Sequence, residues 1–167
     1  MGIEIERKFL VVGEGWRAAA TRMERLVQGY LNPASAVQSG AQRCSVRVRV
    51  AGERAWLNIK SAERGASRQE FEYPLPPADA AALLGLCVDG VVEKHRHHVE
   101  HAGHRWEVDE FLGVNTGLVV AEIELAAVDE AFQRPDWLGR EVTDEARYYN
   151  LALSARPYSA WSAGEKS

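Results

Sequence analysis

Met1-Gly2-Ile3-Glu4-Ile5-Glu6-Arg7-Lys8-Phe9-Leu10 opens the chain and decides its predicted fold. Glu4, Glu6 and Lys8 recur at every second position, and most of the residues between them are apolar. Successive side chains of a β-strand point to opposite faces, so a strand here would carry three charges on one face and mainly apolar groups on the other. We therefore predict a first strand, over residues 3–12, with one charged face.

The same alternation returns along most of the chain. The later charged positions are Arg47, Arg49, Lys60, Glu70, Glu72, Lys94, Arg96, Glu107, Asp109, Glu122 and Glu124. The solvent faces of ordinary sheets contain many Ser, Thr and Gln residues, whereas these faces consist almost entirely of Arg, Lys, Glu and Asp. This choice of residues indicates that the strands enclose a charged lumen.

A lumen with charges of both signs suits one class of ligand. Arg and Lys bind phosphoryl oxygens through charge-assisted hydrogen bonds, and Arg does so in a bidentate manner. Clustered carboxylates hold hard divalent cations such as Mg²⁺ or Mn²⁺. The predicted ligand is a metal-bound polyphosphate.

In order and spacing, these motifs resemble those of the CYTH family of triphosphate tunnel metalloenzymes, over residues 1–155. The resemblance rests on Glu4-x-Glu6-x-Lys8, Arg47-x-Arg49, Lys60, Glu70-x-Glu72, Lys94-x-Arg96, Asp109 and Glu122-x-Glu124. It implies a mainly β fold with a few helices: a closed eight-stranded antiparallel β-barrel, with helices packed outside and a triphosphate bound with metal inside. Residues 156–167 are expected to form a C-terminal tail.

Alternation and turn signals predict further strands and a few helices. The strands are expected at 24–31, 43–51, 54–60, 67–75, 88–101, 104–111 and 119–126, an arrangement that suits a barrel or a sandwich. Pro77 followed by strong helix formers predicts a helix that ends near Gly85. Two shorter helices are predicted at 129–132 and 143–153, a flexible loop at 32–42 and a frayed end at 163–167.

The resemblance implies roles for individual lumen residues. The predicted metal ligands are Glu4, Glu6, Glu122 and Glu124, with Asp109 and Glu72 assisting, and two Mg²⁺ or Mn²⁺ ions are expected in each site. The predicted substrate-binding residues are Lys8, Arg47, Arg49, Lys60, Lys94 and Arg96. Catalysis is assigned to Lys8, Glu4 and Glu6. The basic residues could instead only pair with the acids in an empty barrel, but buried charge is costly even when paired, so a functional interpretation is favoured.

Five histidines gather between positions 95 and 104. Their spacing matches no standard zinc motif, and the chain contains neither His-Glu-x-x-His nor Cys-x-x-Cys. Alternation places His98 on the lumen face and His95, His97 and His101 outside. A structural zinc site is therefore not favoured here.

Composition and charge argue against nucleic-acid binding, a membrane span and secretion. A net charge of -4 over 167 residues gives no overall attraction to nucleic acid polymers, and no run of 18 apolar residues predicts a membrane span. Early charges such as Glu4 and Lys8 argue against a secretory signal. Cys44 and Cys87 are expected to be free thiols. We expect a cytoplasmic protein, monomeric or homodimeric, that binds neither membrane nor nucleic acid.

The predicted function is metal-dependent hydrolysis of inorganic tripolyphosphate or a related triphosphate, most like that of the small bacterial tripolyphosphatases. Thiamine triphosphatase and class IV adenylate cyclase activities are alternatives within the same family. A noncatalytic polyphosphate or nucleotide sensor is the alternative from another class. Both Glu-x-Glu pairs favour the enzyme, because phosphate binding alone requires no acid cluster.

Overall fold

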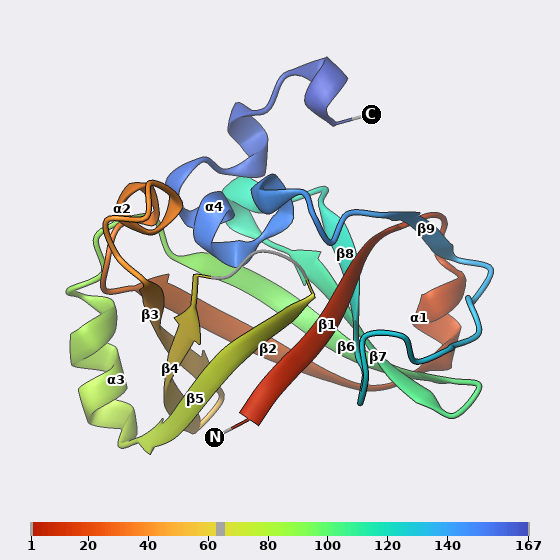
Figure 1. Ribbon diagram of the computed structural model, residues 1–167, viewed down its shortest axis with the longest axis horizontal. Coiled ribbons are helices and arrows are strands. Elements are labelled where there is room, and N and C mark those ends of the chain that lie inside the picture. The colour runs from red at the N-terminus through yellow and green to blue at the C-terminus, as the bar shows by residue number, and fades with distance from the viewer. Residues whose placement is uncertain (1, 63–65, 167) are drawn as a thin grey trace.

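A computed structural model of the protein describes residues 2–62 and 66–166, which form one antiparallel sheet rolled into a barrel (Figure 1). Its strands are β1 (Gly2–Val11), β2 (Ala20–Tyr30), β3 (Cys44–Ala51), β4 (Arg54–Ser61), β5 (Ser67–Leu75), β6 (Val92–His101), β7 (His104–Phe111), β8 (Val119–Glu124) and β9 (Leu138–Glu141). The strand order is β5-β4-β3-β2-β6-β7-β8-β1, and pairing of β5 with β1 closes the circle. The predicted eight-stranded barrel is confirmed, and the sandwich is excluded.

The first strand, β1, closes the barrel by pairing with other strands along both of its edges. One edge pairs with β8 from Glu6 to Leu10. The other edge pairs with β5 from Gly2 to Ile5 and then with β9 at Phe9 and Val11, so β9 lies outside the barrel circle. Between these two partners, the Lys8 amide donates to Thr143 Oγ1 (3.0 Å) and the Lys8 carbonyl accepts from the Val142 amide (2.8 Å). The chain after β9 therefore completes the seam of the barrel.

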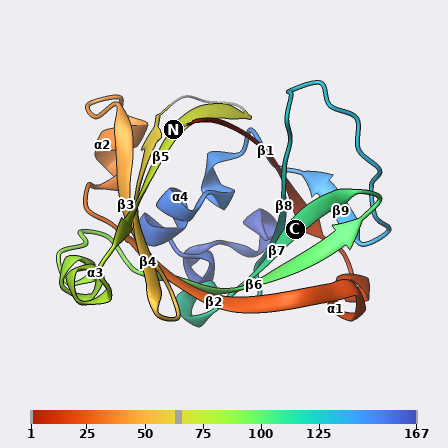
Figure 2. The same ribbon diagram turned by 90° about the horizontal axis from the view of Figure 1, so that it is seen from below.

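Helices cover parts of the outer surface and one end. The helix α3 (Pro77–Leu84) was predicted, and it buries Ala80 against Val48 and Ala55 on the outside of the barrel. The short helices α1 (Gly15–Ala19) and α2 (Ala34–Gln38) were not predicted, and α2 replaces part of the expected loop at 32–42. Seen along the barrel in Figure 2, α4 (Asn150–Ala155) lies across the far end.

One helix prediction was wrong and a second was only partly right, for different reasons. Residues 129–132 form a turn followed by an irregular segment, in which Phe132 packs against Phe9 and Trp106 and the Glu130 carboxylate accepts from the Ala126 amide. The expected helix at 143–153 is interrupted by Tyr149, whose extended backbone (φ -79°, ψ 142°) separates a 3-10 turn from α4. In both places contacts of an aromatic side chain, with other rings at Phe132 and with the Thr143 carbonyl and Arg68 at Tyr149, prevail over local helix propensity.

Two other boundaries differ from the prediction. The strand expected at 88–101 begins only at Val92, because the Gly90 amide instead donates to the Ser154 carbonyl and ties this segment to α4. The end expected to fray forms a 3-10 helix at Ala163–Glu165, which the Glu165 carboxylate stabilises by accepting from the Ser162 amide and from Arg156. Capping bonds of this kind follow from side-chain placement that alternation does not reveal.

A close approach explains one glycine of the second strand. A Cβ atom at Gly29 would lie 2.5 Å from the Cys87 Sγ atom, well inside contact distance. Only glycine therefore lets the segment after α3 pack directly on β2. Cys44 and Cys87 are free thiols, as predicted.

Candidate active site

The barrel encloses a cavity of about 1060 Å³ with charged walls. Tyr149, Asn150, Leu151 and Ala152 line it at the end covered by α4. The charged residues that line it are Glu4, Glu6, Lys8, Arg47, Arg49, Lys60, Arg68, Glu70, Glu72, Lys94, Arg96, Glu100, Arg105, Glu107, Glu122, Glu124 and Asp144. The alternating charges of the sequence thus converge on one space.

The structure brings together every predicted site residue except one. Asp109 does not line the cavity and is 0% exposed. Its carboxylate accepts hydrogen bonds from Lys94 and, at 2.7 Å, from both Arg96 Nε and Arg96 Nη2. Asp109 therefore lies outside the cavity and binds Lys94 and Arg96. It cannot reach a ligand in the lumen unless these two side chains move.

Lys8 and Lys94 are both buried in the lumen, each with a side chain surrounded by other charges. Burial alone favours the neutral amine, but the Glu122 and Glu6 carboxylates around Lys8 raise its pKa above the ordinary value. Burial and the Arg96 guanidinium together lower the pKa of Lys94 to about 8, although Asp109 opposes the shift. The two lysines thus differ in their readiness to release a proton.

On β1 and β8 the acids outnumber their cations locally. Burial and the neighbouring Glu6 carboxylate raise the pKa of Glu4 to about 7, even though Lys60 donates to both Glu4 oxygens at 2.7 and 2.9 Å. Burial and the carboxylates of Glu107, Glu6 and Glu70 raise the pKa of Glu124 as well. Glu4 and Glu124 resist full ionisation because burial disfavours their charged forms and neighbouring carboxylates add repulsion.

This surplus of carboxylate oxygen fits a hard divalent cation. Glu4, Glu6, Glu122 and Glu124 offer oxygen ligands only, which suits Mg²⁺ or Mn²⁺ better than metals that prefer thiolate or imidazole. Among residues 2–62 and 66–166, no three Asp, Glu, His or Cys side chains already lie at the spacing of metal ligands. Lys60 binds Glu4, and Lys8 lies 3.2 Å from Glu6, so these acids would exchange ammonium partners for the metal.

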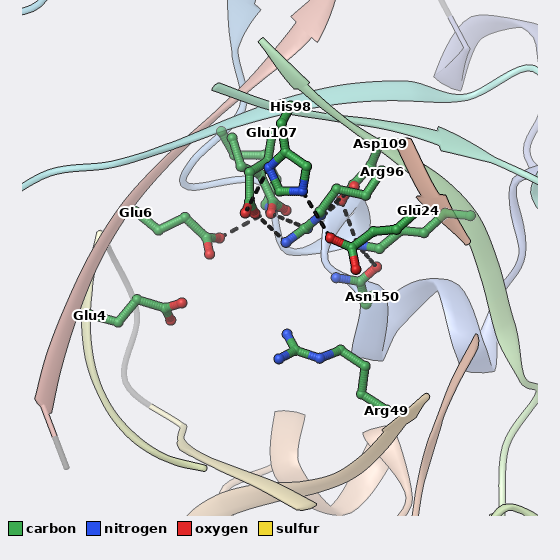
Figure 3. Close-up of polar contacts among 12 residues, drawn as sticks. Glu4, Glu6, Glu24, Arg49, Arg96, His98, Glu107, Asp109 and Asn150 are labelled. Carbon is green, nitrogen blue, oxygen red and sulfur yellow. Dashed lines mark hydrogen bonds and ion pairs between the residues drawn. The ribbon is translucent and has the colours of Figure 1, made fainter. Parts of the chain in front are cut away.

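The basic side chains extend from other strands toward the same space. In Figure 3, Arg49 points to the centre of the lumen from one wall, and Glu4 and Glu6 point there from another. Arg49 donates to Glu72 at 2.6 Å. Arg96 donates to Glu122 at 2.8 Å and also to Glu107 and Asp109, and these bonds fix its guanidinium in place. A planar donor held in this way is suited to phosphoryl oxygens.

Several lumen residues carry no role in the prediction from sequence, Arg68 and Tyr149 among them. Arg68 precedes Glu70 by two positions on β5, so the alternation already contained the signal for it. Arg68 Nη2 donates to the Tyr149 hydroxyl (3.2 Å), and the Arg68 and Lys8 cations lie 4.9 and 5.1 Å from the Tyr149 ring centre. The Tyr149 hydroxyl donates to the Thr143 carbonyl (2.6 Å). No periodicity marks Tyr149, because it follows a turn outside the barrel strands.

Two histidines of the cluster lie as alternation predicted. His98 lies inside, with Nε2 3.0 Å from Glu24 Oε1 and Nδ1 3.9 Å from Glu107 Oε1 (Figure 3). His97 lies outside, with its ring centre 4.8 Å from that of Trp16. In the described part of the chain, these histidines form no group of three or more candidate metal ligands.

Comparison with known proteins identifies the family. The CYTH domain matches residues 2–156. The chain belongs to the CYTH family. A relative from Acetivibrio thermocellus named inorganic triphosphatase is 43% identical over 159 residues, covering 95% of this chain and 97% of the relative. An inorganic triphosphatase from Nitrosomonas europaea is 34% identical over 155 residues, covering 90% of this chain and 96% of that protein.

Solved structures agree with this CYTH assignment. The crystal structure of an inorganic triphosphatase matches with a TM-score of 0.64 at 31% identity, covering 92% of this chain and 95% of that one. A Hippeastrum protein described as having a dominant triphosphatase activity matches with a TM-score of 0.57, covering 76% of this chain and 80% of that one. At 13% identity, the second likeness shows the fold alone.

Proposed function

We propose that this CYTH protein is a divalent-metal-dependent triphosphatase that hydrolyses inorganic tripolyphosphate. The observation that carries the proposal is one cavity in which buried cations suited to polyphosphate lie beside carboxylates whose pKa values are raised by burial and by neighbouring acids. The two relatives named inorganic triphosphatase, at 43% and 34% identity over most of the chain, support it.

The proposed substrate-binding residues are Lys8, Arg47, Arg49, Lys60, Lys94 and Arg96. The proposed metal ligands are Glu4, Glu6, Glu122 and Glu124, with Glu72 assisting, for two Mg²⁺ or Mn²⁺ ions. Asp109 acts through Lys94 and Arg96, which it orients. Arg68 joins the substrate-binding residues, because it lines the same cavity and contacts Tyr149.

Positioning and charge account for the proposed chemistry. When bound, Mg²⁺ or Mn²⁺ would neutralise phosphoryl oxygens and help activate water for in-line attack. Arg49 and Arg96 offer fixed donors to the negative charge of the phosphoryl group. Lys8 stays cationic between Glu6 and Glu122 and can hold a leaving phosphate oxygen. Lys94, with its pKa near 8, can hold or accept a proton close to neutral pH.

The test is phosphate release from tripolyphosphate, thiamine triphosphate and ATP, each with Mg²⁺, with Mn²⁺ and with EDTA. We expect the highest kcat/KM with tripolyphosphate, no release in EDTA, and recovery when metal is restored. Preference for thiamine triphosphate, or conversion of ATP to a cyclic nucleotide and pyrophosphate, would select one of the other family activities. Tight tripolyphosphate binding without release under any metal condition would indicate a sensor.

A further inference from the structure

Gln28 is a neutral residue in the wall of the charged cavity, on β2 between Leu26 and Tyr30. Gln28 is 1% exposed, and its Nε2 atom is buried without a hydrogen-bond partner in the described structure. A buried amide N–H without an acceptor is costly, and native proteins retain few of them. The position therefore calls for an acceptor that the folded chain does not supply.

The neighbours of Gln28 explain why the chain supplies no acceptor. Strand register places Gln28 opposite Arg49 on β3, and the next lumen pair on that ladder joins Tyr30 to Arg47. On the other side, Lys94 pairs with Leu26, one lumen position away on β6. The side chains of Arg47, Arg49 and Lys94 donate hydrogen bonds and, as cations, accept none.

A second buried donor of the same wall is also without an acceptor. Arg47 Nε has no hydrogen-bond partner in the described structure, and Arg47 lines the same cavity. Two unpaired donors on adjacent strands call for a ligand rich in acceptors. A phosphoryl group fulfils this requirement, because its non-bridging oxygens accept several hydrogen bonds at once.

We propose that the Gln28 amide is a substrate-binding group that donates a hydrogen bond to a phosphoryl oxygen held by the cations of β3 and β6. This inference rests on the proposed triphosphatase function and adds a neutral donor to its charged binding set. The amide strengthens binding without adding positive charge, so Gln28 acts on substrate affinity and leaves the metal-binding acids unaffected.

The proposal predicts opposite effects on binding and on folding. In Gln28→Leu the unpaired donor is removed, so the unliganded protein should keep or raise its thermal midpoint, because an apolar group of similar size no longer leaves a polar atom unsatisfied. The same variant should lose kcat/KM for tripolyphosphate by roughly 10- to 100-fold, the range expected for one hydrogen bond to a charged group. Gln28→Glu should lose more, because a carboxylate accepts hydrogen bonds and repels phosphate.

The experiment measures phosphate release from tripolyphosphate with Mg²⁺ and the thermal midpoint of each protein without ligand. Gln69→Leu is the matched control, since Gln69 is exposed on the outer face of β5, and it should behave as wild type. Wild-type kcat/KM in Gln28→Leu, a lowered thermal midpoint together with the loss, or full activity in Gln28→Glu would each overturn the role of Gln28 alone. Failure of the wild-type protein to release phosphate would overturn the triphosphatase function, and the role of Gln28 with it.

Discussion

Lys8 and Lys94 reach the same lumen from different strands, and the two regions around them differ in charge. The wall formed by β1 and β8 surrounds Lys8 with Glu6 and Glu122, which raise its pKa. On β6 the guanidinium of Arg96 adjoins Lys94 and helps burial to lower its pKa to about 8. The two lysines are equally buried, but their pKa values shift in opposite directions because the neighbouring charges differ. The lumen therefore has two walls that differ in charge. The acid-rich wall, formed by Glu4, Glu6, Glu122 and Glu124 of β1 and β8, is suited to metal, and the base-rich wall, formed by Arg47, Arg49, Lys94 and Arg96 of β3 and β6, is suited to phosphate.

The largest expected effect comes from removing a fixed donor of the base-rich wall. Arg96→Ala should lower kcat/KM for tripolyphosphate by on the order of 100-fold or more, because it removes a planar donor and releases Asp109, Glu107 and Glu122 from their partner. Arg49→Ala should cost less, because Glu72 is the only acid to which Arg49 donates a hydrogen bond within residues 2–62 and 66–166. Substrate titrations of phosphate release measure both effects.

Arg54→Ala is the matched control for these two variants. Arg54 lies at the β3–β4 hairpin, with 59% of its side chain exposed and Glu24 3.4 Å away. We expect nearly wild-type kinetics. A severe loss in Arg54→Ala alongside normal Arg49→Ala and Arg96→Ala would show that the base-rich wall has been assigned to the wrong residues.

The acid-rich wall should respond to metal concentration. Glu4→Gln and Glu124→Gln keep side-chain size but remove a metal-binding charge, so the Mg²⁺ or Mn²⁺ concentration needed for half-maximal phosphate release should rise by roughly 10- to 100-fold. Glu53→Gln, in the exposed β3–β4 turn, should leave this concentration unchanged. Unaltered metal dependence in both lumen variants would remove Glu4 and Glu124 from the metal site.

Glu4 should also make the stability of the metal-free protein depend on pH. Its pKa rises from 4.5 to about 7 on folding, so the folded protein binds more protons between these values and stability falls as pH rises through this window. Above pH 7 the ionised carboxylate costs up to about 3 kcal/mol relative to a neutral side chain. Metal-free Glu4→Gln should therefore match wild type near pH 4.5 and exceed its stability at pH 8.

Denaturant unfolding in EDTA at both pH values measures this difference. Equal stability of wild type and Glu4→Gln at pH 8 would mean that Lys60 fully neutralises Glu4, and that the acid-rich wall carries no unbalanced charge at this position.

The smallest effect concerns Lys94. Below pH 8 the Lys94 amine is charged and above it neutral, so KM for tripolyphosphate should rise several-fold as pH increases through 8. Lys94→Arg keeps the charge throughout and should show a flatter pH profile of KM. An identical rise in wild type and Lys94→Arg would assign the titration to another group.

Alternation was sufficient to predict most of the strands and most of the charged lumen residues, because most inward strand positions are filled by charges. It left a barrel and a sandwich open, and the closed barrel was implied by the resemblance to the CYTH family. Alternation could also have identified Arg68, which shares the face of Glu70. Tyr149 and β9 could not be found in this way, since their positions depend on long-range contacts with Arg68, Lys8 and the edge of β1. The supporting role of Asp109 could not be predicted either, because alternation gives the face on which a residue lies but not that Lys94 and Arg96 separate Asp109 from the cavity.

The seam on β1 bears on how the protein can be re-engineered. Val142 and Thr143 pair the backbone of Lys8, so dividing the chain between β9 and α4 would leave a buried donor and acceptor without partners in the strand that carries Glu4 and Glu6. Split or permuted versions should instead open the chain at the β3–β4 turn, where Gly52 (φ +58°) and Glu53 are exposed. The segment 142–155 must therefore stay covalently continuous with β9 in any split or permuted version, because it pairs with β1 and lines the cavity.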